Sequence, residues 1–366
     1  MDNSEIQTTT IKNVESFIKL RTEWNDLLKE TGNQTPFIRH EWLSAWWTAY
    51  GKDKELCVVC FKKGGRLVGF IPLMRYQSKF LGMNLAVLGF MANHWVELDI
   101  VATAAEREDC LKNFLKMVQK EKRMVILSHF CETSPVFERW LELLSQASLK
   151  FKLKKMSVPY IKLEDSWEGY LKKRTYRFRA EYKKKFKSLK EKGTYQLVRY
   201  QKNSDFNDAL KQAEEIVVNS WQGKNGVAIL SQEEGKFFYQ ELIKTWGPLE
   251  QIDISILKLD DKPLAYLIGF IAEGCFHVFD TGYDDNYKND SPGMVIHNLL
   301  LEILHSSGLK EFNFGYMADY KKRWTEDARV ISDCLIFAKG PMGEVLWQAN
   351  RLKERIKNKK VEVAKD

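Results

Sequence analysis

Three apolar runs in the second half of the chain are separated by very short turns, and this arrangement restricts the fold more than any other feature. The runs are Ile252–Leu259, Leu264–Ala272 and Cys275–Thr281, and the turns are Asp260-Asp261 and Glu273-Gly274. Strands joined by such tight turns pair with their neighbours along the chain in antiparallel fashion. The sequence therefore predicts an antiparallel meander in this half.

A loop, a helix and a short strand are expected directly after the meander. The loop covers residues 282–290, and Ser291 and Pro292 are typical of the N-cap and first position of a helix. Gly308 is expected to end this helix, and Lys310–Phe314 is predicted to be a strand.

The first half repeats a similar order of elements. Helices are expected around Val14–Leu28 and from His40 to Gly51, followed by strands and further helices. After residue 51, strands are expected at 55–62, 67–76, 84–91, 96–101, 123–128, 152–156 and 160–163. Helices are expected at 106–120 and 134–147. The expected fold class is therefore α+β, with two related domains at 1–165 and 166–343, each a mixed, mostly antiparallel sheet flanked by helices. A basic helical tail is expected at 344–366.

Positive charge is concentrated in one segment. The chain has 366 residues and a net charge of +8, whereas residues 171–192 alone hold eleven basic residues against two acids, a net charge of +9. The segment lacks Pro and Gly, and its apolar residues recur at roughly helical spacing, so one continuous helix is expected. Two interpretations stay open: a solvated amphipathic helix, or a basic face for a polyanion such as RNA, a coenzyme phosphate, an acidic glycan or a lipid surface.

Composition excludes several other classes. The 44% hydrophobic and 13% aromatic content favours packed cores over disorder. No apolar run approaches the roughly 20 residues of a membrane helix, and the polar N-terminus lacks the pattern of a signal peptide, so a cytoplasmic protein is expected. Cys57 and Cys60 have C-x-x-C spacing, but they lie in an expected strand and no second Cys or His pair follows at the spacing of a zinc finger, so no metal is expected.

The helix expected at Ser291 has a start suited to an anion. The first N–H groups of a helix have no partner within the helix and carry partial positive charge. Gly293 lacks a side chain and would let a ligand approach the backbone closely. Such a start can hold a pyrophosphate, although alone it indicates only a well-formed helix end.

Short motifs along nearly the whole chain resemble acyltransferases of the GNAT type, in the CelD/BcsL group associated with cellulose biosynthesis. The motifs are TPFIRHEWLSAWWTAYG, LVGFIPLMR, SWQGKNG, LKLDDKPLAYLIGF, GYDDNYKNDSPG and YKKRW. The resemblance implies two tandem GNAT-like domains and transfer of an acyl group, usually acetyl, from acyl-CoA to an amine or hydroxyl. A sugar or polysaccharide precursor is the acceptor that this family suggests.

The resemblance also implies a donor site in the second half. Phe279, Asp280, Thr281 and Gly282 would face the pantetheine arm of the donor. The residues expected near its pyrophosphate are Ser291, Pro292, Gly293 and Met294, with Lys288 as a countercharge.

One departure from the pattern keeps a related donor open. The usual GNAT phosphate loop, Arg/Gln-x-x-Gly-x-Gly/Ala, is replaced by KNDSPG at 288–293. Fem-type aminoacyltransferases share the two-domain plan and use aminoacyl-tRNA, which would suit the basic segment. A non-catalytic module that binds a polyanion is the third possibility.

Candidate catalytic and acceptor residues follow from the same motifs. Acyl transfer needs a proton acceptor for the nucleophile and a proton donor for the leaving group. The expected catalytic residues are Asp284 as base, Tyr283 or Tyr287 as acid, and Tyr320 and Lys321 near the acceptor. The expected acceptor contacts are Trp221, Tyr287, Arg323 and Trp324. Each has a structural alternative: Asp284 as a loop cap, the tyrosines and Trp221 as packing residues, and Lys321 and Arg323 in surface ion pairs.

Overall fold

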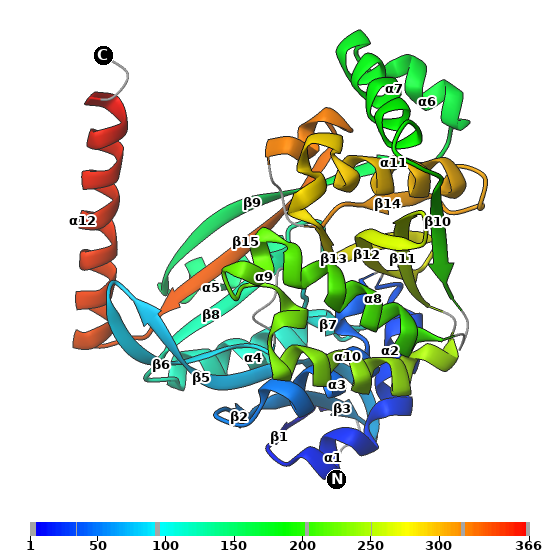
Figure 1. Ribbon diagram of the computed structural model, residues 1–366. Coiled ribbons are helices and arrows are strands. Elements are labelled where there is room, and N and C mark those ends of the chain that lie inside the picture. Colours follow the sequence, from blue (N-terminus) through cyan, green and yellow to red (C-terminus); the bar gives the residue numbers. More distant parts are fainter. Residues whose placement is uncertain are drawn as a thin grey trace.

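The computed structural model describes residues 5–33, 35–91, 96–201, 205–249, 251–315 and 319–363, with side chains up to residue 356. Within these ranges the strands form two sheets (Figure 1). The smaller sheet has the order β1-β3-β4-β7, and the larger has the order β10-β11-β12-β13-β14-β9-β15-β8-β6-β5-β2. Most strand pairs are antiparallel; β13–β14 and β6–β8 are parallel. The expected α+β class, with mostly antiparallel sheets flanked by helices, is confirmed.

The first half supplies both sheets with strands. Its elements are β1 Gln7–Ile11, α1 Val14–Lys19, α2 Arg21–Thr31, the 3-10 turn η1 Pro36–Ile38, α3 His40–Tyr50, β2 Glu55–Leu56, β3 Val58–Lys63, β4 Arg66–Ile71, β5 Leu73–Phe80, β6 Met83–Phe90, β7 Val101–Ala102, α4 Arg107–Lys120, β8 Met124–Cys131, α5 Phe137–Gln146 and β9 Lys150–Lys162.

The second half contains the predicted meander. Its elements are α6 Trp167–Lys173, α7 Tyr176–Lys190, β10 Tyr195–Tyr200, α8 Phe206–Asn219, α9 Trp221–Lys224, η2 Ile229–Ser231, α10 Glu233–Trp246, η3 Gly247–Leu249, β11 Ile252–Leu259, β12 Lys262–Ala272, β13 Cys275–Tyr283, η4 Asp285–Asp290, α11 Pro292–Leu304, β14 Glu311–Asn313, η5 Asp319–Arg323, β15 Ala328–Phe337 and α12 Pro341–Val363.

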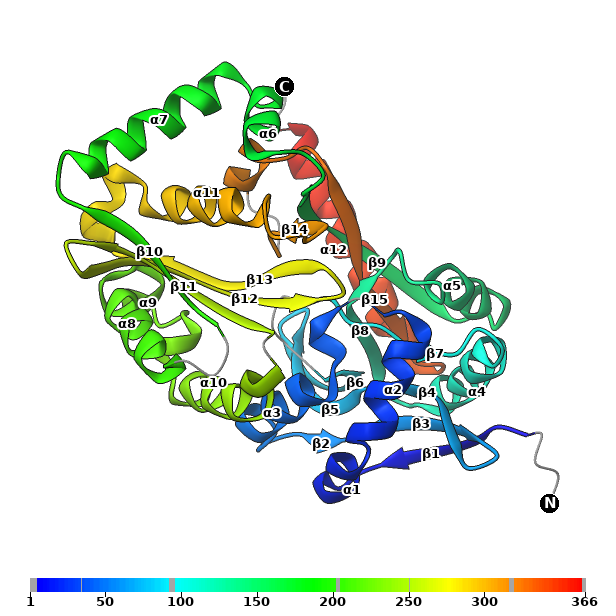
Figure 2. The same ribbon diagram turned by 90° about the vertical axis from the view of Figure 1, so that its right-hand side faces the viewer.

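Helices cover both faces of the meander. Figure 2 shows α8 and α10 on one face of β11–β13 and α11 on the other, with α7 beyond it. The face under α8 and α10 joins a core that continues into the first half, where Trp42 lies against Phe238 with ring centroids 5.7 Å apart. The opposite face packs against α11, α6 and α7 in a second core. The meander is thus fixed between two cores.

Strand β15 links the two halves. It follows the second-half elements along the chain, yet it pairs with β8 and with β9 of the first half. Strand β9 also pairs with β14 through Tyr160–Lys162, so one sheet runs through both halves. The expected domain boundaries at 165 and 343 stay a prediction.

The basic segment does not form one continuous helix, which corrects the expectation for 171–192. The helix is interrupted at Arg174 and Thr175, whose backbones are extended, and the Thr175 hydroxyl accepts a hydrogen bond from the Phe178 N–H at 3.2 Å. Threonine competes well as an N-cap, so it begins a new helix here. The first-half prediction of one helix over 14–28 is also wrong, because α1 and α2 meet at Leu20.

Several predicted strands differ from those observed. The strands expected at 152–156 and 160–163 are one strand, β9, and the run expected at 67–76 is divided at Pro72 into β4 and β5. Of the strand expected at 96–101, only Val101 belongs to a strand. The remainder contributes one isolated bridge, from Leu98 to Phe130.

The last helix, α12, lies beside the far end of the large sheet (Figure 1). Leu346 is buried against Phe337 of β15, and their neighbours form a small separate core. The described part of the chain contains no helix with the length and apolar character needed to span a membrane.

Candidate functional site

Strands β13 and β14 form a fork at the centre of the second half. They pair in parallel only from Cys275 to His277, and β13 then continues to Tyr283 beside β12 alone. Within the described ranges, this part of β13 has no strand partner on its β14 side. An unpaired strand edge offers backbone N–H and C=O groups that a ligand with amide groups can pair with.

Asn313 and Gly315 fix the chain where the fork opens. The Asn313 side-chain oxygen accepts a hydrogen bond from the Gly315 N–H at 2.8 Å, and its amide group donates to Glu97 at 2.9 Å. Gly315 has a φ of 67°, and a Cβ atom there would lie 2.8 Å from the carbonyl oxygen of Val278. The turn away from β13 therefore depends on a residue without a side chain.

A bulge in β13 divides the residues expected to face the donor. The register shifts between Ile268, which lies opposite Asp280, and Gly269, which lies opposite Val278, so Phe279 is the extra residue of the bulge. Phe279 packs into the first core beside Tyr239, and Asp280 accepts hydrogen bonds from Tyr239 at 3.0 Å and Tyr266 at 3.2 Å. Burial raises the pKa of Asp280, and these hydrogen bonds oppose that effect. Both side chains thus contact the α10 side of the sheet.

The start of α11 lies next to the end of β13. Ser291 is the N-cap of α11 and Pro292 its first residue, as expected, but Ser291 adopts a left-handed conformation with a φ of 53° and its side chain makes no cap hydrogen bond. The preceding turn, η4, leads directly into the helix and sets this conformation. A Cβ atom on Gly293 would lie 3.2 Å from the Tyr283 ring. Little room for a side chain remains between the helix start and the strand.

Side chains of α7 and of Lys192, just after it, hold the loop before α11. Asp290 is buried and accepts hydrogen bonds from Ser188 at 2.8 Å and Lys192 at 2.5 Å. Lys185 donates to the backbone carbonyl of Asn289 at 2.5 Å. Lys288, the expected countercharge, is exposed on the same loop. The helix start therefore has several cations near it.

The turn η5 brings three of the expected residues to the same region. Arg323 pairs with Glu181 of α7 at 3.2 Å and lies 3.9 Å from the sulfur of Met294. Tyr320 is 46% exposed, and partial loss of hydration, together with the nearby Tyr283, raises the pKa of its hydroxyl. Lys321 is buried beneath them and donates to the Phe314 carbonyl at 2.8 Å.

Burial also changes the proton affinity of Lys321. Loss of hydration disfavours the charged ammonium and lowers the pKa of Lys321 to about 8. A neutral amine is the form that can accept a proton, so this lysine can act as a base close to neutral pH.

Asp284 and the remaining aromatic residues occupy different positions. Asp284 is buried, accepts a hydrogen bond from the Asn286 N–H at 2.9 Å and lies 3.6 Å from the Lys262 ammonium. Tyr287 has its ring 4.9 Å from the same ammonium. Trp324 is in the second core, where its indole N–H donates to Asn298 at 2.8 Å. Asp284 thus makes the local contacts of a loop cap.

Trp221 does not belong to the apolar stripe of α8, contrary to the core interpretation. It is 51% exposed at the start of α9, because the chain changes direction at Ser220. A Cβ atom on Gly223 would collide with the carbonyl oxygen of Val217, so the glycine permits this close turn. Gln222 donates to the Thr281 carbonyl at 3.4 Å, which places α9 beside the end of β13.

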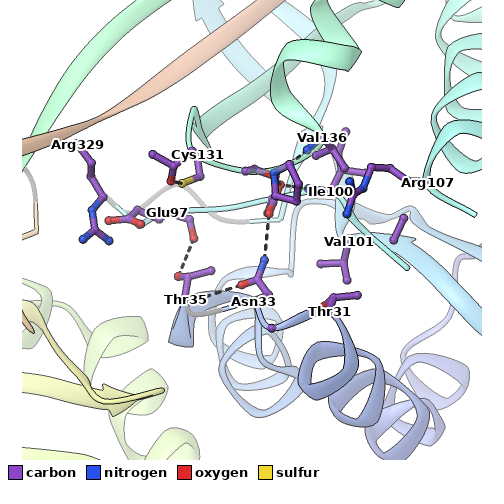
Figure 3. Close-up of a pocket in the computed structure, with 16 residues that line it drawn as sticks. Thr31, Asn33, Thr35, Glu97, Ile100, Val101, Arg107, Cys131, Val136 and Arg329 are labelled. Carbon is purple, nitrogen blue, oxygen red and sulfur yellow. Dashed lines mark hydrogen bonds between the residues drawn. The ribbon is translucent and has the colours of Figure 1, made fainter. Parts of the chain in front are cut away.

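A polar pocket in the first half was not predicted from the sequence. It has a volume of about 180 Å³ and lies between the end of α2 and the starts of α4 and α5 (Figure 3). Glu97 and Asp99 line it and are both buried. The sequence signal that could have indicated this pocket is the pair of acids at alternate positions of the apolar segment VELDIV, because alternate residues of an extended chain face the same side.

Part of the second half is similar to a known family of acyltransferase domains. Residues 176–323 match the family described as "Acetyltransferase (GNAT) domain". This segment contains the fork, α11 and η5. A search of curated proteins found no match to the chain.

Solved structures extend the similarity to the whole fold. A crystal structure of FemX has a TM-score of 0.59 at 10% identity and covers 93% of this chain and 99% of that chain. The C-terminal domain of a putative lysylphosphatidylglycerol synthetase from Agrobacterium fabrum has a TM-score of 0.54 at 12% identity, covering 93% and 97%. The L-PGS structure from Bacillus licheniformis has a TM-score of 0.52 at 14% identity, covering 91% and 96%. At these identities the similarity concerns the fold.

Proposed function

We propose that this protein is an acyltransferase that moves an acyl group from an activated donor in the β13–β14 fork to an amine or hydroxyl. The observation that carries the proposal is the unpaired edge of β13 beside the start of α11, inside the segment that matches a GNAT acetyltransferase domain. An acyl-CoA, with acetyl-CoA as the first choice, is the donor that fits a strand edge next to a helix start.

The fork supplies different groups to the two ends of such a donor. The amide-bearing arm would lie along residues 279–283, and the phosphates would lie near Gly293 with Lys288 and Arg323 as nearby cations. A phosphate at a helix start gains from both the free N–H groups and the helix dipole. The sugar or polysaccharide acceptor suggested by the family resemblance stays part of the proposal.

Lys321 is the residue we favour as proton acceptor over Asp284. Its lowered pKa keeps part of the population neutral near neutral pH, whereas Asp284 is committed to Asn286 and Lys262. In the transfer, the acceptor nitrogen or oxygen loses a proton and bonds to the acyl carbon, and the carbon–sulfur bond of the donor breaks. Tyr320 or Tyr283 would return a proton to the leaving thiolate.

Calorimetric titration with coenzyme A and acetyl-CoA tests the donor. We expect both to bind, and Gly293→Glu to weaken binding at least tenfold, because it adds bulk and negative charge beside Tyr283. Ile303 of the same helix is 41% exposed, so Ile303→Glu adds the same charge away from the fork and is the matched control. Failure of both ligands to bind, or equal binding by the two variants, would contradict the proposal.

An aminoacyl-tRNA donor is the second candidate, favoured by exposed cations on α7. Lys183 and Lys184 are exposed, and no ion pair is recorded for either among the described residues. If RNA binds here, affinity for unfractionated tRNA falls steeply with salt. Replacing both with Ala weakens it, while replacing Lys116 and Lys120 of α4 does not. Absence of tRNA binding at low salt would eliminate this donor.

A further inference from the structure

The pocket beside α4 and α5 contains equal numbers of acidic and basic side chains. Glu97, Asp99, Arg107 and Arg329 all line it. Hydroxyl and amide groups of Thr31, Asn33, Thr35, Thr133 and Ser134 complete the polar lining. A simple anion would meet two carboxyl groups here, and a simple cation would meet two guanidinium groups. Burial raises the pKa of both carboxyl groups, so a bound ammonium group would favour their ionised forms, and the pocket then suits a ligand that carries both signs.

Asp99 provides a fixed carboxyl group in the middle of the pocket. It is 5% exposed, and one oxygen accepts hydrogen bonds from the Ser134 hydroxyl at 2.7 Å and the Ile100 N–H at 2.8 Å. The other oxygen accepts from Asn33 at 3.0 Å. These donors come from three separate segments, so the orientation of the carboxyl group is set before a ligand arrives.

Arg107 provides an uncommitted cation at one end. It is the first residue of α4, and its Nε atom is buried without a hydrogen-bond partner among the described residues. No ion pair is recorded for it in that part of the chain either. A buried donor without a partner is unfavourable, and the guanidinium fork suits a carboxylate in bidentate geometry.

Glu97 marks the opposite end, which reaches the fork. Figure 3 shows Glu97 and Arg329 at one end of the pocket and Arg107 at the other. Glu97 accepts a hydrogen bond at 2.9 Å from Asn313, the last residue of β14. Arg329 is already paired with Glu311. A ligand held by Arg107 therefore extends toward the point where β13 and β14 separate.

We propose that this pocket binds a small amino acid, with its carboxylate on Arg107 and its ammonium group toward Asp99 and Glu97. The volume of about 180 Å³ suits a small molecule and excludes a polymer chain. This inference rests on the proposed function, because it makes the bound amino acid the acceptor. The transfer forms one N-acyl bond and breaks the donor's thioester; of the two protons that the ammonium loses, one goes to the thiolate and one to solvent.

Isothermal titration with glycine, L-alanine and L-glutamate, in the absence of donor, tests the pocket. At least one of them is expected to bind, with acetate and methylamine at least tenfold weaker because each satisfies only one charge. Arg107→Gln is expected to weaken amino-acid binding at least tenfold, and Arg107→Lys to retain part of it. Arg66→Gln removes an exposed arginine of the same half, paired with Glu30, and is the matched control.

The outcomes separate this inference from the proposed function. Lack of amino-acid binding up to 10 mM, or equal binding by Arg107→Gln and the wild type, overturns the pocket assignment. Coenzyme A binding is measured on the same preparations, and Arg107→Gln is expected to leave it unchanged. If coenzyme A binds and amino acids do not, only the acceptor assignment fails; the reverse result removes the acyl-CoA donor and leaves the pocket.

Discussion

Replacing Asp99 with Asn should change how the stability of the protein depends on pH. Burial raises the pKa of Asp99 from 3.8 to about 7, although hydrogen bonds from Ser134, Ile100 and Asn33 and the charge of Arg107 oppose this shift. Between these two values the folded protein holds a proton that the unfolded chain has released. The free energy of unfolding therefore falls as pH rises through this window.

The magnitude follows from the two pKa values. Each unit of pKa difference corresponds to about 1.4 kcal/mol, so Asp99 costs the fold about 4 kcal/mol at pH 7. About 2 kcal/mol of this arises between pH 5 and pH 7. Asn cannot ionise, and its side-chain oxygen can still accept from Ser134 and Ile100. The stability of the variant relative to wild type should therefore increase by about 2 kcal/mol over this interval.

Urea unfolding of both proteins at pH 5, 6 and 7, followed by tryptophan fluorescence, measures this difference. A titration of the aspartate carboxyl carbons by NMR locates the pKa directly, since the Asp99 resonance is the one missing from the variant. A constant stability difference between pH 5 and pH 7, or an Asp99 carboxyl that titrates near 4, would refute the reasoning.

Three further substitutions test other parts of the structure. Gly315→Ala should lower the free energy of unfolding by more than the roughly 1–2 kcal/mol that a left-handed alanine costs, because its Cβ would meet the Val278 carbonyl. Gly308 is also left-handed but lies in open space, so Gly308→Ala in the same urea assay measures the backbone cost alone. Burial lowers the pKa of Lys321 in the folded protein to about 8, whereas the unfolded chain keeps this proton up to about pH 10.5. The free energy of unfolding of the wild type should therefore rise by about 3 kcal/mol between pH 8 and 10.5, and Lys321→Met should abolish this rise. Equal dependence of stability on pH in the two proteins would contradict this. Asp253→Ala should cost about 3–5 kcal/mol in thermal or urea unfolding, because it leaves Arg199 without its buried partner, and a loss below 1 kcal/mol would show that the pair contributes little.

The meander could be predicted because its information is local. Short turns at Asp260-Asp261 and Glu273-Gly274 lie between apolar runs, and the structure contains the three strands with bounds close to those expected. The helix beginning at Pro292 was likewise marked by its own residues. Where a turn or a fixed φ determines an element, neighbouring residues suffice.

Local cues also caused errors where a better local alternative was present. Thr175 interrupts the basic segment because its hydroxyl caps a new helix. The prediction of one helix considered charge and apolar spacing and did not consider this capping preference. Ser291 follows the sequence pattern of an N-cap, but the turn from η4 sets it in a left-handed conformation in which the side chain makes no cap hydrogen bond. Each error concerns one residue at which two favourable conformations compete.

The candidate site could be predicted only in part, because distant segments assemble it. The resemblance placed Tyr283, Gly293, Met294 and Arg323 in one region, and contacts between β13, α11 and η5 bring them together. The pocket around Asp99 combines the end of α2, the segment before β7 and the start of α5. The periodicity of a single segment does not indicate which distant segments pack together.

The position of β15 affects how the newly made chain can mature. This strand pairs with β8 on one side and with β9 on the other, although it is synthesised after every other strand that the structure describes. During synthesis, the edges of β8 and β9 that pair with β15 stay unpaired until residue 337 has emerged from the ribosome. A chain released early would expose two long strand edges, and it would be prone to aggregate rather than to yield a working first half.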